Sequence, residues 1–258
     1  MAITTEQIKE LRDETGVSVM QCKRALEEAG GDKEKALMIL KKKSSEVALK
    51  KSDREALDGV IVSKITNGKG VMLTLHCETD FVAKNSDFTT LANSLADKAL
   101  AEGVEKMKNE AMDMINPVIQ KIGENIQLGE ISEVSGDIIG SYIHDGKSGT
   151  MIALTGGNAD VAKDIAMHTT AMRPEYITRE EIAPEMIEKA KELFKEEVDA
   201  SGKPEEIKQK MLDGKLATYF KEQTLLDQPF VKNPDLTIEG LLKQNGATIS
   251  KIVRMSIR

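Results

Sequence analysis

Short stretches of the sequence recur at a constant spacing of 79 residues, and no gap is needed to align them. The matching stretches are Gly70-Val71-Met72 with Gly149-Thr150-Met151, Val82-Ala83-Lys84 with Val161-Ala162-Lys163, and Thr90 and Ala92 with Thr169 and Ala171. A constant spacing over such a length is typical of a duplicated structural unit. We therefore expect a core made of two similar α/β halves that pack together.

Each half contains the pattern of a β-hairpin followed by a helix. Strand-forming residues flank Asn67-Gly68 in the first half and Asp145-Gly146 in the second, and both dipeptides favour tight turns with positive φ. The segment 248–257 is rich in spaced apolar residues and predicts a returning strand. Together these patterns predict an α+β fold with antiparallel sheets.

Two further segments have helical patterns. The segment 103–122 predicts a helix that is interrupted near Pro117. The charged segment 184–226 predicts an inserted helical hairpin, because Ser-Gly-Lys-Pro at 201–204 separates two helix-forming stretches.

The first 54 residues differ in charge from the rest of the chain. They carry a formal net charge of +2, whereas the remaining 204 residues carry −9. Ser18 and Gln21 have the spacing of a capping box, Gly30-Gly31 ends a helix, and Asp32 can begin the next one. These signals predict a separate domain of three short helices, followed by a charged linker.

Composition argues against several classes of function. The net charge of −7 lacks the basic surface of a duplex-binding protein, and no apolar run reaches the roughly 18 residues of a membrane span. Two cysteines cannot form a disulfide framework or a four-cysteine zinc site. The N-terminus lacks the pattern of a secretory signal, so we expect a cytoplasmic protein with reduced thiols and no direct contact with nucleic acid or membrane.

Two segments look like a phosphate-binding loop and a metal site but lack what these sites require. Asp145-Gly146-Lys147-Ser148 ends like a phosphate-binding loop, but Ser141 stands where that motif needs a glycine, and a strand is expected to follow. His76 and Cys77 point to opposite faces of one strand and cannot share a metal. We therefore expect no catalytic residues, no metal and no cofactor, and the protein is not expected to be an enzyme.

One corner of the repeat differs between its two copies. The first copy has Glu78-Thr79-Asp80-Phe81 where the second has Gly157-Asn158-Ala159-Asp160. A pair that is needed only for the fold should more often recur in both copies. Two interpretations remain: Asp80 caps a helix and Phe81 anchors the core, or the Asp-Phe pair serves a function.

Longer segments resemble the translation elongation factor Ts family, over essentially the whole chain. The segments are LRDETGVSVMQCKRALEEAGGDKEKALMIL, HCETDFVAKNSDF, Lys121 to Ile126, Ser141 to His144, and LLDQPFVKN at 225–233. The resemblance implies a ubiquitin-associated-like three-helix domain with its linker at 1–54 and a first core subdomain at 55–136. It further implies a second core subdomain at 137–183 plus 227–258, and the helical hairpin at 184–226.

The resemblance also implies a function and a site. The family consists of guanine-nucleotide exchange factors for the GTPase elongation factor Tu, and they make and break no covalent bond. Thr79, Asp80, Phe81 and Val82 match the element that reaches the partner's Mg²⁺ site, with Phe81 as an apolar wedge. His144, Val19 and Met20 are implied as further partner contacts. Gln21 stands where the family usually has Asp. The alternative is a non-catalytic binding scaffold that uses the three-helix domain.

Overall fold

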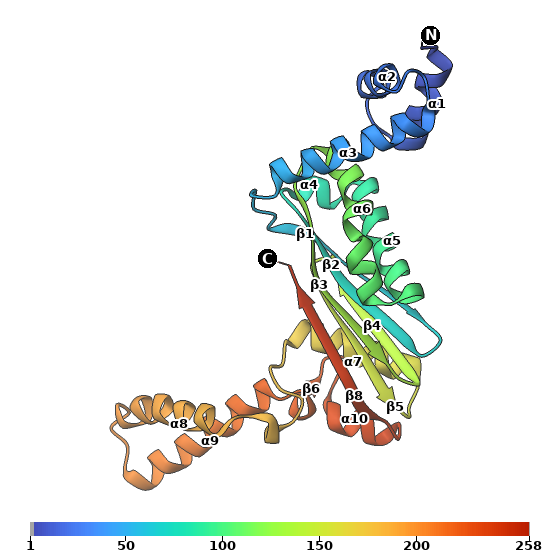
Figure 1. Cartoon of the computed structure of the whole chain (residues 1–258). Coiled ribbons are helices and arrows are strands. Elements are labelled where there is room, and N and C mark those ends of the chain that lie inside the picture. The colour runs from blue at the N-terminus through green and yellow to red at the C-terminus, as the bar shows by residue number, and fades with distance from the viewer. Residues whose placement is uncertain (1–2, 258) are drawn as a thin grey trace. The chain divides into compact units, whose positions relative to one another are not determined.

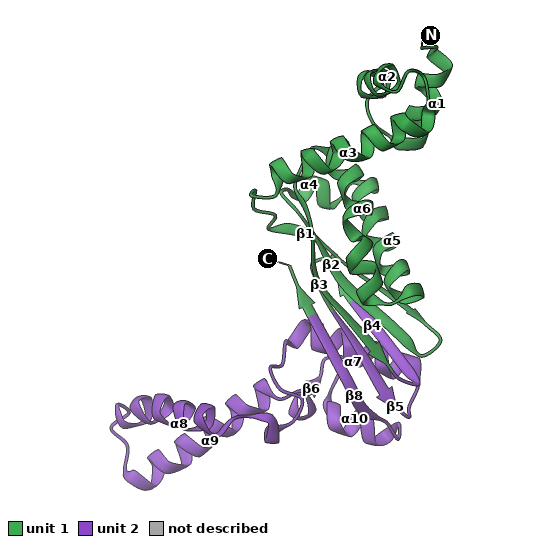
Figure 2. Cartoon of the chain, in the orientation of Figure 1, with its two compact units in different colours: residues 1–135, 143–149, 255–258 green, residues 136–142, 150–254 purple. Residues whose placement is uncertain are grey.

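The computed structural model describes residues 3–257, so the predicted parts 1–54 and 227–258 each extend slightly outside the described residues. The chain combines helices with antiparallel sheets, which confirms the predicted α+β class (Figure 1). It separates into two compact units (Figure 2). Unit 1 comprises Met1–Ser135, Ile143–Gly149 and Met255–Arg258, and unit 2 comprises Gly136–Tyr142 and Thr150–Arg254.

Three helices open the chain: α1 (Thr5–Thr15), α2 (Val19–Glu28) and α3 (Lys33–Lys51). The predicted capping box at Ser18 is formed, and Asp32 accepts a hydrogen bond from the Lys35 N–H to begin α3. The helices share a small apolar cluster of Leu11, Val17, Cys22, Ala25, Leu26, Ala36 and Leu40. A three-helix arrangement is therefore present, and α3 continues through most of the predicted linker.

Unit 1 contains a sheet of three strands in the order β1 (Asp58–Thr66), β2 (Lys69–Cys77) and β3 (Ile126–Ser135). Asn67 and Gly68 have φ values of 43° and 75°, which confirms the predicted tight turn between β1 and β2. β3 was not predicted, because its polar residues and Gly129 hide the alternation of a strand.

Helices α4 (Asp80–Ala83), α5 (Ser86–Glu102) and α6 (Val104–Ile122) connect β2 to β3. In Figure 1, α5 and α6 lie along one face of the sheet. Val71, Leu73, Leu75 and Cys77 of β2 belong to the apolar core that these helices share. These four residues occupy alternate positions of β2, so all of them lie on the helix-covered face.

Pro117 does not interrupt α6, so that part of the prediction is wrong. Proline removes one backbone donor and normally kinks or ends a helix. Here Ile115 and Ile119, on either side of Pro117, are both buried in the core. Their burial stabilises the helix on both sides of the proline and offsets the lost hydrogen bond.

The second sheet has the order β4 (Ile138–His144), β5 (Ser148–Thr155) and β8 (Thr248–Ser256). Asp145 and Gly146 have φ values of 49° and 71°, which confirms a hairpin turn rather than a phosphate-binding loop. The returning strand is β8, as predicted. Helix α7 (Ala159–Met172) packs on this sheet together with α10 (Ile238–Gln244), and neither α10 nor the short strands β6 (Pro229–Phe230) and β7 (Asn233–Thr237) was predicted.

The charged insertion forms the predicted helical hairpin of α8 (Pro184–Asp199) and α9 (Glu205–Gln223), flanked by the short 3₁₀ turns η1 (Arg179–Glu181) and η2 (Leu225–Asp227). Phe194 and Tyr219 meet edge to face between α8 and α9, with ring centroids 5.6 Å apart.

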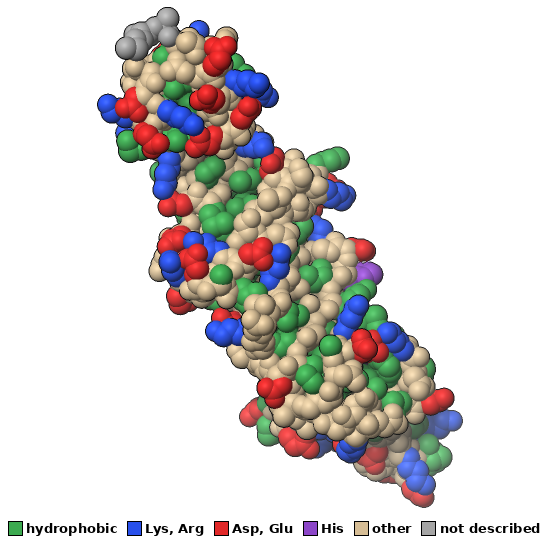
Figure 3. Space-filling model, turned by 90° about the vertical axis from the view of Figure 1, so that its right-hand side faces the viewer, with side chains coloured by type: hydrophobic (Ala, Val, Ile, Leu, Met, Phe, Trp, Pro, Cys, Tyr) green, Lys and Arg blue, Asp and Glu red, His purple; other side chains and the backbone are tan. Residues whose placement is uncertain are grey.

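Acidic and basic side chains are mixed over the face of the molecule drawn in Figure 3, without an extended patch of one sign. Among the described helices, none is long and apolar enough to span a membrane.

Unit 2 contains a buried histidine, which generates a prediction about pH. His168 on α7 is fully buried, its Nδ1 accepts the Val231 N–H at 3.2 Å, and its Nε2 lies 2.9 Å from Gln228 Oε1. Burial lowers the pKa of His168. Below about pH 6.5 the unfolded chain therefore binds a proton that the folded chain resists, and stability falls as pH falls.

We predict that the free energy of unfolding decreases between about pH 7.5 and about pH 5.5, and that His168→Gln reduces this decrease. Urea unfolding at several pH values measures the slope. His144→Asn, the loss of an exposed histidine, is the matched control. An identical slope in wild type and His168→Gln would contradict the prediction. A residual slope is expected from His76, whose pKa is also lowered by burial.

Candidate functional site

The N-cap of α4, the helix after β2, is Thr79. One interpretation of the sequence had assigned this role to Asp80. Thr79 has an extended backbone, with φ −131° and ψ 155°, and its Oγ1 accepts the Val82 N–H at 3.4 Å. This is the geometry of an N-cap. The capping interpretation of Asp80 is therefore wrong, and the carboxylate of Asp80 is not used to begin the helix.

Phe81 is not a core anchor either, because 82% of it is exposed. Asp80 is also exposed, and its Oδ2 lies 2.9 Å from Lys84 Nζ. Val82 and Ala83, in contrast, are buried in the core of unit 1. The single turn of α4 thus presents Asp80 and Phe81 to solvent, and we call these two residues the Asp-Phe tip.

A helix break separates the Asp-Phe tip from α5. Asn85 has an extended backbone, and its side chain accepts the Asp87 N–H at 2.8 Å, so a new helix begins at Ser86. At the matching corner of unit 2, Asn158 caps α7 in the way that Thr79 caps α4. There α7 continues without a break to Met172, so unit 2 has no separate short helix at this corner.

The turn between α6 and β3 holds the corner that carries the Asp-Phe tip. Glu124 in this turn accepts hydrogen bonds from the Glu78 N–H, the Thr79 N–H and the Thr79 hydroxyl, at 3.1, 3.1 and 2.8 Å. Glu124 lies in the segment Lys121 to Ile126, which resembles the family, but no role was predicted for it. Nothing local in the sequence pairs Glu124 with Thr79, because 45 residues separate them.

Val19 and Met20 lie in the first turn of α2. They are 49% and 57% exposed, while Cys22, Ala25 and Leu26 on the same helix are buried. The helix therefore has an apolar side that packs within the three-helix domain, and two further apolar side chains that face solvent. Gln21 completes the capping box with Ser18.

His144 ends β4 and is exposed, with its Nε2 3.5 Å from Asp145 Oδ2. His144 lies in the segment Ile143–Gly149, which belongs to unit 1. The Ile61 N–H of β1 donates to Gly146 O at 2.8 Å, and Lys147 forms an ion pair with Asp58. Burial raises the pKa of Asp58, but the hydrogen bonds from Lys147 and Gly59 outweigh it and leave this pKa below its ordinary value.

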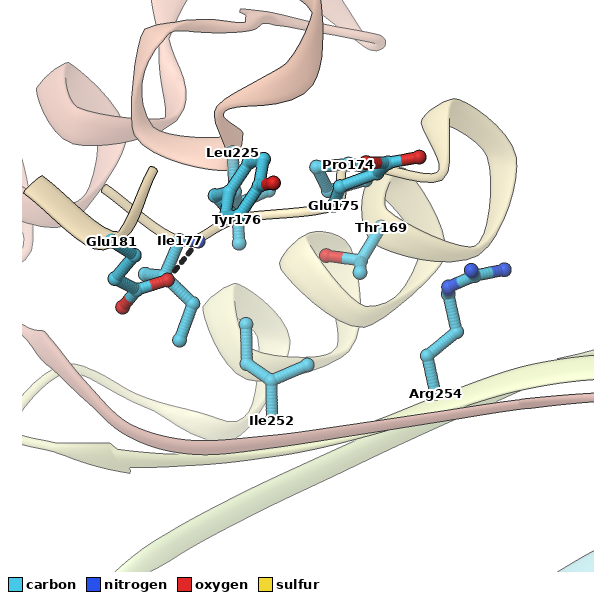
Figure 4. A pocket seen from close by; sticks show the side chains of 9 residues that line it. All are labelled: Thr169, Pro174, Glu175, Tyr176, Ile177, Glu181, Leu225, Ile252 and Arg254. Carbon is cyan, nitrogen blue, oxygen red and sulfur yellow. Dashed lines mark hydrogen bonds between the residues drawn. The ribbon is translucent and has the colours of Figure 1, made fainter. Parts of the chain in front are cut away.

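Unit 2 contains a cavity of about 480 Å³ beside α7 and β8 (Figure 4). Its lining comprises Thr169, Pro174, Glu175, Tyr176, Ile177, Glu181, Leu225, Ile252 and Arg254. Glu181 accepts the Ile177 N–H at 2.8 Å. The lining contains no histidine or cysteine, so it offers no pair of nucleophile and base.

Within residues 3–257, no group of three or more His, Cys, Asp or Glu residues is arranged to hold a metal ion. The exposed features at this site are instead an aromatic ring and a carboxylate on a short helix, held by a buried valine and a clamped N-cap. Large exposed apolar side chains at fixed positions are typical of surfaces that bind another macromolecule. Fold and site thus define an α+β protein whose candidate site is an exposed surface tip rather than a pocket.

Comparisons with known proteins give the family. The family described as "Elongation factor TS" matches residues 78–258. Elongation factor Ts of Hahella chejuensis is 40% identical over 263 residues, which cover 99% of this chain and 92% of that protein. Elongation factor Ts of Hydrogenobaculum sp. is 41% identical over 273 residues, which cover 100% of this chain and 99% of that protein. The chain belongs to the elongation factor Ts family, as the resemblance predicted.

The thiols generate a prediction for this corner of the structure. Cys22 and Cys77 are both free and buried. Burial raises the pKa of Cys77 to about 12, so its thiol stays protonated and a poor nucleophile at neutral pH. We predict that neither cysteine of the folded protein reacts rapidly with Ellman's reagent and that both react in denaturant. Rapid reaction of Cys77 in the native protein would show that the corner opens readily.

Proposed function

We propose that this protein is a guanine-nucleotide exchange factor that binds elongation factor Tu in its GDP-bound state and promotes release of GDP during translation elongation. Membership of the elongation factor Ts family supports the partner and the process. The observation that carries the proposal is the Asp-Phe tip, in which an 82% exposed phenylalanine stands beside an exposed carboxylate. No covalent bond is made or broken in this function.

The chemistry of the partner's site explains how such a tip can act. A GTPase holds GDP through backbone amides, a lysine and a Mg²⁺ ion that bridges phosphate oxygens to the protein. Mg²⁺ demands near-ideal octahedral geometry, so a displacement of about 1 Å in its surroundings weakens its binding strongly. Phe81 is proposed to enter between elements beside the ion and to shift them. The ion can then be loosened without direct contact.

Asp80 is proposed to compete for the hydrogen bonds and charges around the ion. In the free protein its carboxylate pairs with Lys84 one turn along the chain, and both side chains are exposed. An exposed ion pair of this kind contributes little free energy, roughly 0–1 kcal/mol. Asp80 can therefore leave Lys84 for a group on the partner at small cost.

The Asp-Phe tip cannot supply the whole effect. Accelerating release by about 10⁴-fold requires about 5.5 kcal/mol, whereas burying one phenylalanine contributes about 1.5–3 kcal/mol. The remaining docking surface must favour the partner in its distorted, empty state, whereas Val19, Met20 and His144 are proposed as contacts that hold the partner equally before and after GDP release. Linkage then requires that the protein binds nucleotide-free partner more tightly than GDP-bound partner, by the factor by which it weakens GDP.

We further propose that the core arose as a duplicated α/β unit and that the N-terminal helices form a ubiquitin-associated-like domain. The duplication is supported by two hairpins with positive-φ turns and by the N-caps Thr79 and Asn158, which keep the repeat spacing and each accept the N–H three residues on. The N-terminal assignment is supported by three capped helices around one small apolar cluster.

The first functional prediction concerns the Asp-Phe tip. Release of fluorescent GDP from elongation factor Tu should speed up with added protein and reach a plateau rate at saturation. The double variant Asp80→Ala, Phe81→Ala should lower that plateau by about 10- to 100-fold, the effect of losing one buried phenylalanine, while still binding the partner. Met112→Ala, another exposed apolar side chain, is the matched control and should keep the wild-type plateau.

Two outcomes of this experiment would contradict the proposal. Release that is unaffected by the wild-type protein would refute the exchange function. A double variant that loses binding but keeps the full plateau rate within the complex would refute the role of the tip as a wedge.

The second functional prediction separates docking from exchange. Val19→Ala with Met20→Ala should raise the concentration of protein needed for half-maximal GDP release, because two exposed apolar contacts are lost. The plateau rate should stay within about threefold of wild type, since these residues act in binding and not beside the nucleotide. A lowered plateau with an unchanged half-saturating concentration would assign Val19 and Met20 a different role.

A further inference from the structure

We propose that Glu124 is a positioning residue for exchange, and that its carboxylate sets the direction in which the Asp-Phe tip meets the partner. This inference rests on the proposed exchange function. Glu124 does not belong to the tip: it lies in the turn between α6 and β3, and the structure brings it to the N-cap of α4.

The contacts of Glu124 engage both of its oxygens. Its Oε2 accepts the N–H groups of Glu78 and Thr79, each at 3.1 Å, and its Oε1 accepts the Thr79 hydroxyl at 2.8 Å. Hydrogen bonds to an ionised carboxylate are stronger than those between neutral groups. Three of them from two consecutive residues hold the backbone at the start of α4 in one orientation.

The same contacts direct the hydroxyl of Thr79. An ionised carboxylate can only accept, so the Thr79 proton points to Glu124 and an oxygen lone pair is left for the Val82 N–H, 3.4 Å away. Glu124 therefore orders the N-cap as well as the loop before it. Without Glu124 the hydroxyl can rotate, and the capping bond competes with other orientations.

The Asp-Phe tip depends on this support because it has little of its own. Phe81 is 82% exposed, and the ion pair of Asp80 is with Lys84 on the same short segment. The direction in which both side chains point therefore depends on the orientation of the backbone between Thr79 and Val82. Glu124 holds one end of that backbone and the buried Val82 holds the other. A tip ordered before contact loses less conformational entropy on binding.

The turn that carries Glu124 is itself fixed to its surroundings. The Asn125 N–H donates to Glu78 Oε1 at 2.6 Å, so each segment supplies a carboxylate to the backbone of the other. The Asn125 side chain donates to Arg54 O at 2.6 Å, and Lys51 donates to Gly123 O. At the repeat spacing of 79 residues, the residue that matches Glu124 is Lys203, in the turn between α8 and α9, so the clamp has no counterpart at that position.

The test measures exchange and binding separately for Glu124→Ala. We expect the plateau rate of fluorescent GDP release to fall by about 10- to 100-fold, the size of effect that a misplaced group produces, while the half-saturating concentration changes by less than about threefold. Glu124→Gln keeps one accepting oxygen and should fall between wild type and Glu124→Ala. Glu130→Ala, an exposed carboxylate on β3, is the matched control and should match wild type.

A double-variant cycle shows whether Glu124 acts through the tip. If it does, Glu124→Ala should cause little further loss in a protein that already carries Phe81→Ala. A loss of equal size in both backgrounds would overturn the proposal, because Glu124 would then act independently of Phe81. An unchanged plateau in Glu124→Ala would overturn it as well.

Amide hydrogen exchange keeps this test distinct from the test of the function. In the free protein, Glu124→Ala should lower the protection of the Glu78 and Thr79 amides by at least about tenfold, with core amides such as that of Leu73 unchanged. Unaltered protection at both amides would overturn the clamp, even if the wild-type protein accelerates GDP release. If protection falls as expected but wild type does not accelerate release, the exchange function fails while the clamp stands.

Discussion

Burial of the central strand β2 is the constraint on which the rest of unit 1 depends. β2 pairs with β1 along one edge and with β3 along the other, and Val71 to Leu75 are buried on both faces. A strand held at both edges and on both faces cannot shift its register without exposing its apolar residues. The fixed register of β2 therefore fixes the position of the corner that follows Cys77, and with it the position of the Asp-Phe tip.

The short helix α4 at this corner is stabilised by several contacts that act together. A helix of one turn has little stability of its own, since nucleation is costly and α4 is only four residues long. The Thr79 cap and the buried Val82 supply what the short helix lacks, and Glu124 orders the cap. The result is a rigid support beneath an aromatic side chain that the protein's own core does not use.

Structural features that depend on residues close together in the sequence were predicted correctly. The turns at Asn67-Gly68 and Asp145-Gly146, the capping box of Ser18 and the break at 201–204 all follow from local backbone preferences. Features that depend on residues far apart in the sequence were not predicted. β3 was missed because its partner decides its strand state, and α6 passes through Pro117 because Ile115 and Ile119 are buried on either side of it.

The amino-acid sequence alone indicates the family, the α+β class and the occurrence of the Asp-Phe pair in one copy of the repeat. All of these depend on residue identity, periodicity or spacing along the chain. The packed structure shows that Thr79, and not Asp80, caps the helix and that Phe81 faces solvent. It also shows that Glu124, 45 residues away from Thr79, holds this cap. Burial and long-range hydrogen bonding are properties of the packed chain, and no local pattern encodes which side of a single helical turn the core will take.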